Sequence, residues 1–314
     1  MGCKGVQTIL EASRDVQFTR FENGRWQTVD GTVVREDLVR LHVNGQELAR
    51  LMCTPRELDH LALGFLRSEG FIQSMADVRL INVCPSQTCV EVWLRDASFE
   101  PPGRGIITSG CGGGITFADL TAKAKPLDSD LRVTPGQISR LLRSFLAGQQ
   151  QRGIHTAALA TGETLVVVTE DVGRHNTINR LWGHCLVAGI PTRDCILLST
   201  GRISSEMLNK AARMEIPVVV SRTSPTSLAV ALARAWHVTL VGYARRDSLN
   251  VYAGQERIAV AEAVDEASAC DLGAGHRHLD REGCDQPRVV VARRGGEHDQ
   301  SLARGPPLAS RRRL

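Results

Sequence analysis

Between residues 164 and 243 the chain alternates short apolar segments with amphipathic ones, and this alternation restricts the fold more than any other feature. Apolar, β-branched segments predict strands at Thr164–Thr169, Cys195–Ser199, Pro217–Ser221 and Val238–Tyr243. The segments between them predict helices near Arg174–Leu186, Ser204–Met214 and Pro225–Ala235. Nearly wholly apolar strands are typical of a parallel sheet that is buried on both faces. The sequence therefore predicts a layered α/β domain.

A smaller α+β unit is predicted over residues 31–105. Asn44-Gly45 between alternating segments indicates a β-hairpin. Thr54–Glu57 has the pattern of a capping box, with Pro55 at the first helical position, and predicts a helix that ends at Gly70. Two further strands are expected near Val78–Val83 and Cys89–Leu94.

Composition divides the rest of the chain. Residues 1–30 are polar and aperiodic and predict a flexible arm, and residues 106–133 hold a flexible glycine-rich loop and a connection. The α/β domain is expected over residues 134–254, with a first helix that starts at Thr134-Pro135. Residues 255–314 contain no aromatic residue and no lysine, so they predict a disordered tail.

Composition and charge exclude several classes of protein. Apolar residues make up 42% of the chain, which is enough for a core, and the formal net charge is only +4. Basic runs interleaved with aromatic residues are absent, which argues against nucleic-acid binding. No apolar run approaches the ~20 residues of a membrane span, and residues 1–15 lack the apolar segment of a signal peptide. The nine cysteines are odd in number and irregularly spaced, so we expect reduced thiols in a cytoplasmic protein.

Cys111 lies in a run of small residues, Gly105–Asp119. Its neighbouring glycines let the backbone turn sharply, and the N–H groups of such a loop stabilise a reactive thiolate. The competing interpretation is a glycine-rich hairpin turn that happens to contain a cysteine. Cys84 and Cys89 have C-x4-C spacing without a second pair, which favours two thiols over a zinc site.

Polar residues follow each predicted strand of the α/β domain. Ligands of open α/β sheets bind beyond the carboxyl ends of the strands. The segments there carry arginine with hydroxyl or amide donors: Glu170–Asn176, Ser199–Arg202, Ser221–Thr226 and Tyr243–Asp247. For any single segment a structural role is the better explanation: Asp171, Ser204 and Ser224-Pro225 are ordinary helix caps, and His175 is a structural histidine. Together they predict a site for an anion that carries several phosphates.

Several motifs resemble the formate dehydrogenase accessory sulfurtransferase (FdhD) family. The likeness runs from about Arg35 to Tyr252 and rests on Leu61–Gly70, His155–Leu159, Glu170–Asn176, Ser199–Ser204 and Ser221–Ala229. The resemblance implies a cytidine deaminase-like layered α/β domain with a smaller domain, in a homodimer. It also implies a sulfurtransferase. Such a protein carries sulfane sulfur from a cysteine desulfurase to the molybdenum cofactor, bis(molybdopterin guanine dinucleotide), to activate formate dehydrogenase.

The resemblance, combined with the polar edge, suggests roles for individual residues. Cys111 would carry the persulfide, and Asp171 and His175 would position the loop or relay protons. Ten residues are expected to bind the cofactor: Tyr243, Ala244, Arg245, Arg246, Asp247, Ser248, Arg202, Arg222, Asn176 and Ser199. No metal ligand is expected, because Ala157 stands where a deaminase would need glutamate and no P-C-x-x-C follows.

One position departs from the family pattern. The loop usually carries C-x-x-C, and here Gly114 stands in place of the second cysteine. A single persulfide on Cys111 is still chemically sufficient. The departure keeps a second hypothesis open, a non-catalytic chaperone that binds the molybdenum cofactor for formate dehydrogenase. A zinc hydrolase is a third hypothesis, and a redox sensor is a fourth.

Overall fold

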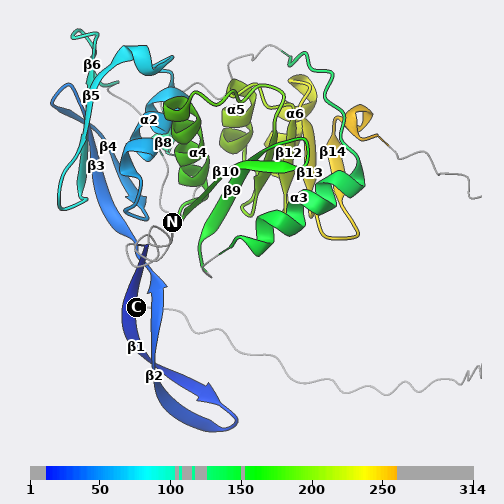
Figure 1. The fold of residues 1–314 in the computed structure, drawn as a ribbon, viewed down its shortest axis with the longest axis horizontal. Helices are drawn as coiled ribbons and strands as arrows, with labels where there is room; N and C mark the ends of the chain where they lie inside the picture. Colours follow the sequence, from blue (N-terminus) through cyan, green and yellow to red (C-terminus); the bar gives the residue numbers. More distant parts are fainter. Residues whose placement is uncertain (1–11, 103–105, 108–114, 117–125, 150–152, 260–314) are drawn as a thin grey trace, which may run out of the picture. The chain divides into compact units, whose positions relative to one another are not determined.

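A six-stranded sheet forms the largest layer of the structure (Figure 1). The computed structural model describes residues 12–102, 106–107, 115–116, 126–149 and 153–259, all of them within the compact unit Met1–Glu262. A four-stranded sheet and two two-stranded ladders complete the strands of these residues. The predicted α/β class is therefore confirmed. The cytidine deaminase-like assignment and the domain limits 31–105 and 134–254 stay predictions.

The centre of the large sheet is parallel, as the alternation predicted. Its strand order is β10-β9-β11-β12-β13-β14. The parallel neighbours are β11 (Ile196–Ser199), β12 (Val218–Ser221) and β13 (Thr239–Gly242). Every residue of these three strands is buried, since the sheet is covered on both faces.

The strand expected as parallel at Thr164–Thr169 is antiparallel, so that prediction was wrong. β10 (Thr164–Asp171) lies at the edge of the sheet and pairs with β9 (His155–Thr161). The two strands are joined by two residues, whereas a parallel pair needs a long crossover. Val166 and Val168 are 42% and 44% exposed, so β10 has an open face that its apolar sequence concealed. A further antiparallel strand, β14 (Asn250–Ala253), pairs with β13.

Helices pack on both faces of the large sheet. Successive strand residues point to opposite faces, and each face has its own apolar cluster. Leu197 belongs to the cluster that includes α4 (Arg174–Ala188), α5 (Ser205–Arg213) and α6 (Ser227–Ala235). Leu198 belongs to the cluster of α3 (Pro135–Ala147). Because helices cover both faces of the sheet, the loops and the first turns of the helices lie at the carboxyl ends of the parallel strands.

The starts of α3 and α5 were predicted correctly, whereas the start of α6 was not. Thr134 and Ser204 accept hydrogen bonds from backbone N–H groups of α3 and α5, at 3.1 and 3.4 Å. The expected cap of α6 at Ser224-Pro225 was wrong, because Thr226 accepts the N–H of Ala229 at 3.3 Å. Pro225 instead forms an isolated bridge with Ile203, which extends the backbone and delays the helix.

The smaller sheet forms where the sequence predicted it. Its order is β4-β3-β6-β5, and α2 (Leu58–Glu69) shares its apolar core. Asn44 and Gly45 both have positive φ, 49° and 81°, as the expected hairpin turn requires. Gly70 ends α2 in the left-handed conformation, with φ of 85°. The strands of this sheet are β3 (Asp37–Val43), β4 (Gln46–Cys53), β5 (Val78–Val83) and β6 (Cys89–Leu94).

The start of α2 does not contain the predicted capping box. Glu57 precedes the helix with a left-handed φ of 43° and makes no side-chain cap. Thr54 instead accepts the N–H of Val172 at 3.2 Å. Arg180 donates to the carbonyl oxygens of Thr54 and Glu57, each at 3.1 Å. Contacts with residues more than a hundred positions away thus replace the local cap.

α2 and α4 cross in direct backbone contact. A Cβ atom added to Gly64 would lie 1.6 Å from the carbonyl oxygen of Asn179, and one added to Gly183 would lie 1.8 Å from that of His60. Ordinary van der Waals contact is about twice as long. The two glycines therefore set how closely the smaller sheet's helix approaches the large sheet's helix.

The flexible arm expected over residues 1–30 is a β-hairpin in its described part. β1 (Ser13–Glu22) pairs with β2 (Arg25–Val34) over ten residues each. Asn23 and Gly24 form the two-residue turn, with φ of 51° and 78°. The sequence interpretation overlooked this Asn-Gly signal, because the flanking strands mix polar and apolar residues on each face and nearly all of these residues are exposed.

Two predicted flexible segments are partly ordered. Within the expected connection 106–133, the N–H of Leu127 binds the carbonyl of Trp236 at 2.9 Å, and Val133 is buried. The first residues of the expected tail pack against the domain, since Arg257 is buried and donates to the carbonyl of His237 at 2.8 Å. Residues 260–314 lie outside the described residues. In the ranges that are described, no helix combines the length and the apolarity needed to cross a membrane.

Candidate functional site

The polar segments singled out in the sequence meet at one edge of the large sheet. Ser199 and Ser221, the last residues of β11 and β12, lie side by side. Asp171 ends β10 beside His155, which starts β9, and β9 is antiparallel to both β10 and β11. Gly242 ends β13, which is parallel to β12. All four segments therefore open from the same edge, where α/β proteins bind ligands.

Backbone hydrogen bonds join these loops to one another. The N–H of Arg222 binds the carbonyl of Ser199 at 3.1 Å, and the N–H of Ala244 binds the carbonyl of Ser221 at 3.0 Å. The Ser221 hydroxyl donates to the carbonyl of Gly201 at 2.7 Å. The loops after β11, β12 and β13 thus form a continuous frame.

A pocket of about 230 Å³ lies between this frame and α3. It brings together three of the predicted arginines, Arg222, Arg245 and Arg246, with Arg143 of α3. The sequence interpretation missed Arg143. The helical spacing of α3 could have indicated it, since one face of the helix carries Ser139, Leu142, Arg143 and Leu146. The remaining lining residue is Ala244. Four of the residues that line this small pocket are arginines, and guanidinium groups bind anions, above all phosphates.

Hydrogen bonds fix the side chain of one pocket arginine and the backbone of another. Arg245 donates through Nη1 to the carbonyl oxygens of Arg222 and Ala244, at 2.6 and 3.0 Å. Ser139 of α3 donates to the carbonyl of Arg246 at 2.6 Å, which ties the last loop to the helix. Arg246 and Asp247 are 3.9 Å apart and highly exposed, so this pair contributes little to stability.

Tyr243 stands at the entrance to the last loop in a strained backbone conformation. Its φ is 50°, a left-handed value that bulky residues rarely adopt. A hydrogen bond from its N–H to the carbonyl of Thr223, 3.1 Å long, helps to hold this geometry. The side chain is 46% exposed, so its ring is available to a ligand. Strain of this kind is concentrated at binding sites.

The other predicted cofactor ligands take different positions. Arg202 is exposed and does not line the pocket. Ser199 is buried, and its hydroxyl accepts the N–H of Gly201 at 3.1 Å. Asn176 donates through Nδ2 to the carbonyl of Met52 at 2.8 Å and to Asp171 at 3.0 Å, so its amide hydrogens are used inside the protein. Asp247 and Ser248 are exposed beside the pocket arginines.

Asp171 is the centre of a buried ionic network. It forms a hydrogen-bonded ion pair with Arg180, and both side chains are fully buried. Its carboxylate also accepts the N–H groups of Gly173 at 2.8 Å and Thr54 at 3.3 Å. Burial raises the pKa of Asp171, while the Arg180 guanidinium and the N–H donors oppose that rise. The network links the start of α4 to the segment before α2, a structural role that sequence spacing did not reveal.

A second buried polar group joins α4 to α5. His175 Nε2 lies 3.3 Å from both the Ser204 hydroxyl and a carboxylate oxygen of Glu206. Lys210 pairs with Glu206 at 3.2 Å and donates to the Asn179 amide oxygen at 2.8 Å. Burial lowers the pKa of His175 to about 4, with Glu206 opposing and Lys210 reinforcing the change. His175 is therefore a neutral imidazole near pH 7.

Cys111, the predicted sulfur-carrying residue, lies outside the described residues. The chain on either side of it is placed by β7 (Ile106–Ile107) and β8 (Ile115–Thr116), which pair antiparallel. The Thr116 hydroxyl donates to a buried oxygen of Glu69 in α2, at 2.9 Å. The predicted role of Cys111 stays a prediction.

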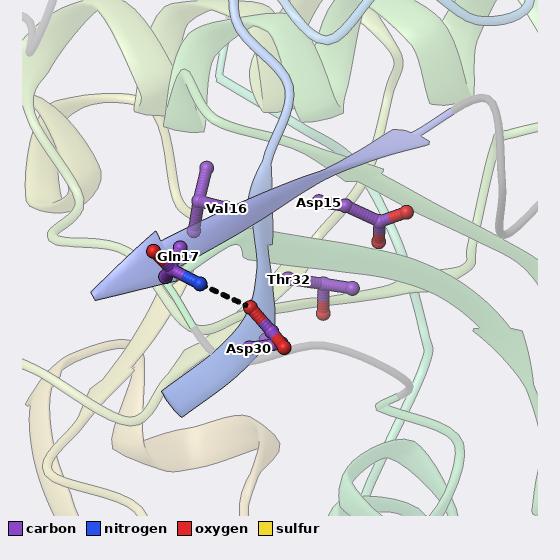
Figure 2. Close-up of a pocket in the computed structure, with 6 residues that line it drawn as sticks. Asp15, Val16, Gln17, Asp30 and Thr32 are labelled. Carbon is purple, nitrogen blue, oxygen red and sulfur yellow. Dashed lines mark hydrogen bonds between the residues drawn. The ribbon is translucent and has the colours of Figure 1, made fainter. Parts of the chain in front are cut away.

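A larger hollow of about 520 Å³ lies against the β1–β2 hairpin (Figure 2). Its described lining contains two carboxylates, Asp15 and Asp30, and no basic residue. Gln17 donates to Asp30 at 3.1 Å across the hairpin. Because two carboxylates repel an anion, this hollow does not suit the phosphate-bearing ligand that the sequence predicts.

Known proteins match most of this chain. A model of the FdhD/NarQ family matches residues 34–259. The sulfur carrier protein FdhD of Bacillus subtilis (strain 168) is 35% identical over 258 residues, 79% of this chain and 98% of that protein. A protein of the same name from Shouchella clausii (strain KSM-K16) is 35% identical over 265 residues, 81% of this chain and 98% of the relative. A crystal structure from Desulfotalea psychrophila, described as a candidate formate dehydrogenase accessory protein, has a TM-score of 0.68 and 30% identity. It covers 79% of this chain and 100% of the other.

Proposed function

The chain belongs to the FdhD/NarQ family, and from this premise we propose that it is a sulfur carrier for formate dehydrogenase. In this proposal it receives sulfane sulfur from a cysteine desulfurase and passes it to the molybdenum cofactor. The observation that carries the proposal is the arginine-lined pocket at the carboxyl edge of the sheet. A carrier that acts on a cofactor with several phosphates needs such a pocket.

The sulfur would be carried by Cys111. Its thiolate attacks the outer sulfur of a donor persulfide, the bond between the two donor sulfurs breaks, and the electron pair leaves with the donor thiolate. Cys111 then carries the outer sulfur as its own persulfide. In the second transfer a nucleophilic acceptor takes the outer sulfur, the sulfur–sulfur bond breaks, and its electron pair stays on Cys111, which returns to the thiolate.

The pocket would hold one phosphate-bearing end of bis(molybdopterin guanine dinucleotide). Its volume of about 230 Å³ is below the ~300–1,000 Å³ of pockets that enclose whole ligands. A diphosphate fits this size better than the complete cofactor does. Arg143, Arg222, Arg245 and Arg246 supply fork-shaped donors that match phosphate oxygens. The exposed ring of Tyr243 offers a surface on which a guanine or pterin ring can stack.

Replacing the proposed carrier residue tests the function. In cells that lack the native protein, the Cys111→Ala variant is expected to leave formate dehydrogenase assembled but inactive. The matched control is Cys270→Ala, which lies outside residues 34–259 that match the family. Normal enzyme activity with Cys111→Ala would show that this thiol carries no sulfur.

The loop sequence favours one further candidate function. Gly114 stands where the family usually has a second loop cysteine, which suits a chaperone that binds the cofactor without carrying sulfur. The two functions differ in one measurable property. After incubation with a cysteine desulfurase and cysteine, a carrier gains one sulfur atom on Cys111 by mass spectrometry, and a chaperone does not.

A further inference from the structure

Two cysteines face each other where the β5–β6 hairpin turns. Val83 and Val90 are the last paired residues of the ladder, and Cys84 and Cys89 occupy the next positions. The N–H of Cys84 binds the carbonyl of Cys89 at 3.0 Å. Directly opposed residues of antiparallel strands have Cα atoms roughly 4.5–5.5 Å apart, which lies within the range that a disulfide spans.

The sulfur of Cys84 is surrounded by hydrogen-bond donors. The N–H of Cys89 donates to it at 2.9 Å, and the hydroxyl groups of Ser86 and Thr88 lie at 3.2 and 3.8 Å. The two hydroxyls are 2.8 Å from each other. When the sulfur is a thiolate it accepts the N–H of Cys89 and a hydroxyl hydrogen of this Ser86–Thr88 pair, so the turn stabilises the anion.

The two thiols also hydrogen-bond to each other and ionise differently. Burial opposes ionisation of Cys84, but the Cys89 thiol and the two hydroxyls outweigh it and lower the pKa to about 6. Cys89 changes in the opposite sense, since its bond to Cys84 raises its pKa. Cys84 is thus a ready nucleophile, and Cys89 holds a proton beside it.

Other described thiols lack this combination. Cys53 and Cys185 are buried, and burial raises the pKa of each, that of Cys185 to about 12. Cys84 and Cys89 are partly exposed at the end of a hairpin. A donor molecule can therefore approach the pair, which is built from a nucleophile and an adjacent second thiol.

We propose that Cys84 and Cys89 form a second sulfur-accepting site, in which Cys84 takes sulfane sulfur from a persulfide and Cys89 releases it as sulfide. The proposal rests on the sulfur-carrier function, which supplies persulfides as the oxidant. It assigns the accepting step to Cys84 and the releasing step to Cys89, at a turn separate from the arginine-lined pocket.

The two steps balance in atoms and electrons. The Cys84 thiolate first attacks the outer sulfur of a persulfide, whose sulfur–sulfur bond breaks and whose inner sulfur leaves as a thiolate. Cys89 then attacks the inner sulfur of the Cys84 persulfide, forming a Cys84–Cys89 disulfide. The outer sulfur leaves as hydrosulfide and, at neutral pH, partly takes up the proton that Cys89 releases. The two thiols are oxidised, the sulfane sulfur is reduced, and a dithiol reductant restores the site.

Single substitutions separate the two steps. The full chain is reduced, freed of reductant without oxygen, treated with glutathione persulfide, alkylated and mapped by peptide mass spectrometry. The wild-type protein is expected to show a Cys84–Cys89 linked peptide and about one equivalent of released sulfide. Cys89→Ser is expected to keep one additional sulfur atom on Cys84, and Cys84→Ser is expected to show neither product.

Each other outcome has a definite meaning. An unmodified Cys84 in Cys89→Ser, with sulfur found on Cys111 of the same sample, overturns this inference and leaves the proposed function intact. A stable Cys84 persulfide in the wild-type protein overturns the role of Cys89. If Cys89→Ser gains sulfur on no cysteine at all, both the inference and the sulfur-carrier function are overturned. Equal melting temperatures of the two variants and the wild-type protein establish that each serine chain is folded.

Discussion

Cys84 is expected to react as a thiolate at pH values where an ordinary cysteine is protonated. Its pKa is about 6, against an ordinary value of 9.0. At pH 6 about half of Cys84 is ionised, compared with about one-thousandth of an ordinary thiol. A thiolate of lower pKa is a weaker nucleophile, and a Brønsted coefficient of ~0.4–0.5 reduces its rate about 20-fold. The gain in ionisation is larger, so Cys84 should react about 20-fold faster than an ordinary thiol at pH 6 and about fourfold faster at pH 7.

The rate of reaction with a small aromatic disulfide measures this expectation. Samples quenched at intervals between about pH 4.5 and about pH 9.5 are digested, and the Cys84 peptide is quantified by mass spectrometry. The rate should rise through a midpoint near pH 6 and level off above about pH 7. Ser86→Ala removes the hydroxyl 3.2 Å from the sulfur and should move the midpoint upward. A rate that still climbs between about pH 8 and about pH 9.5 in the wild-type protein would refute the assigned ionisation.

Three further expectations address packing, pH and ligand binding. Gly183→Ala should lower the free energy of unfolding by about 2 kcal/mol or more in urea titrations, because its Cβ would lie 1.8 Å from the His60 carbonyl. The control is Gly136→Ala, whose added Cβ would lie 3.4 Å from the Arg140 side chain and should raise the free energy of unfolding by about 0.5–1 kcal/mol. Equal stability of the two variants would contradict the close helix crossing. His175 has a pKa of 6.5 in the unfolded chain and about 4 in the folded protein, so the unfolded chain takes up this proton first as the pH is lowered. The free energy of unfolding should therefore decrease by up to about 3 kcal/mol as the pH falls from about 6.5 to about 4, and His175→Gln should reduce that decrease. Arg222→Ala should weaken binding of guanosine diphosphate about tenfold by calorimetry, whereas Arg140→Ala, whose exposed side chain pairs with Glu163, should leave it unchanged.

Much of the fold follows from patterns that are local in sequence. Apolar runs of β-branched residues located β11, β12 and β13 within one or two residues, because such strands are buried on both faces. Asn44-Gly45 and Gly70 marked a turn and a helix end, because each requires a positive φ. The direction of β10 relative to its neighbour could not be predicted from the residues of that strand alone. The neighbour of β10 is decided by a two-residue connection to β9, whose alanine-rich sequence did not indicate a strand.

The candidate site was predictable in outline. The carboxyl ends of parallel strands converge wherever the helices lie, so the sequence was enough to bring Arg222 and Arg245 to one edge. Contributions from other layers were not predictable in this way. Arg143 reaches the pocket from a helix on the face of the sheet, and Thr54 reaches Asp171 from before α2. Helical spacing places Arg143 on one face of α3, but only tertiary packing decides that this face meets the loops and that Thr54 meets Asp171.

The frame at the carboxyl edge is joined largely through peptide groups, which nearly every amino acid supplies. Arg222 contributes its N–H and its carbonyl to that frame, and neither depends on its guanidinium. The side chain at this position can therefore be exchanged while its N–H still binds the Ser199 carbonyl and its carbonyl still accepts from the Arg245 guanidinium. Substitution of a few side chains could then change the charge of the ligand that the pocket selects, while the backbone frame stays the same.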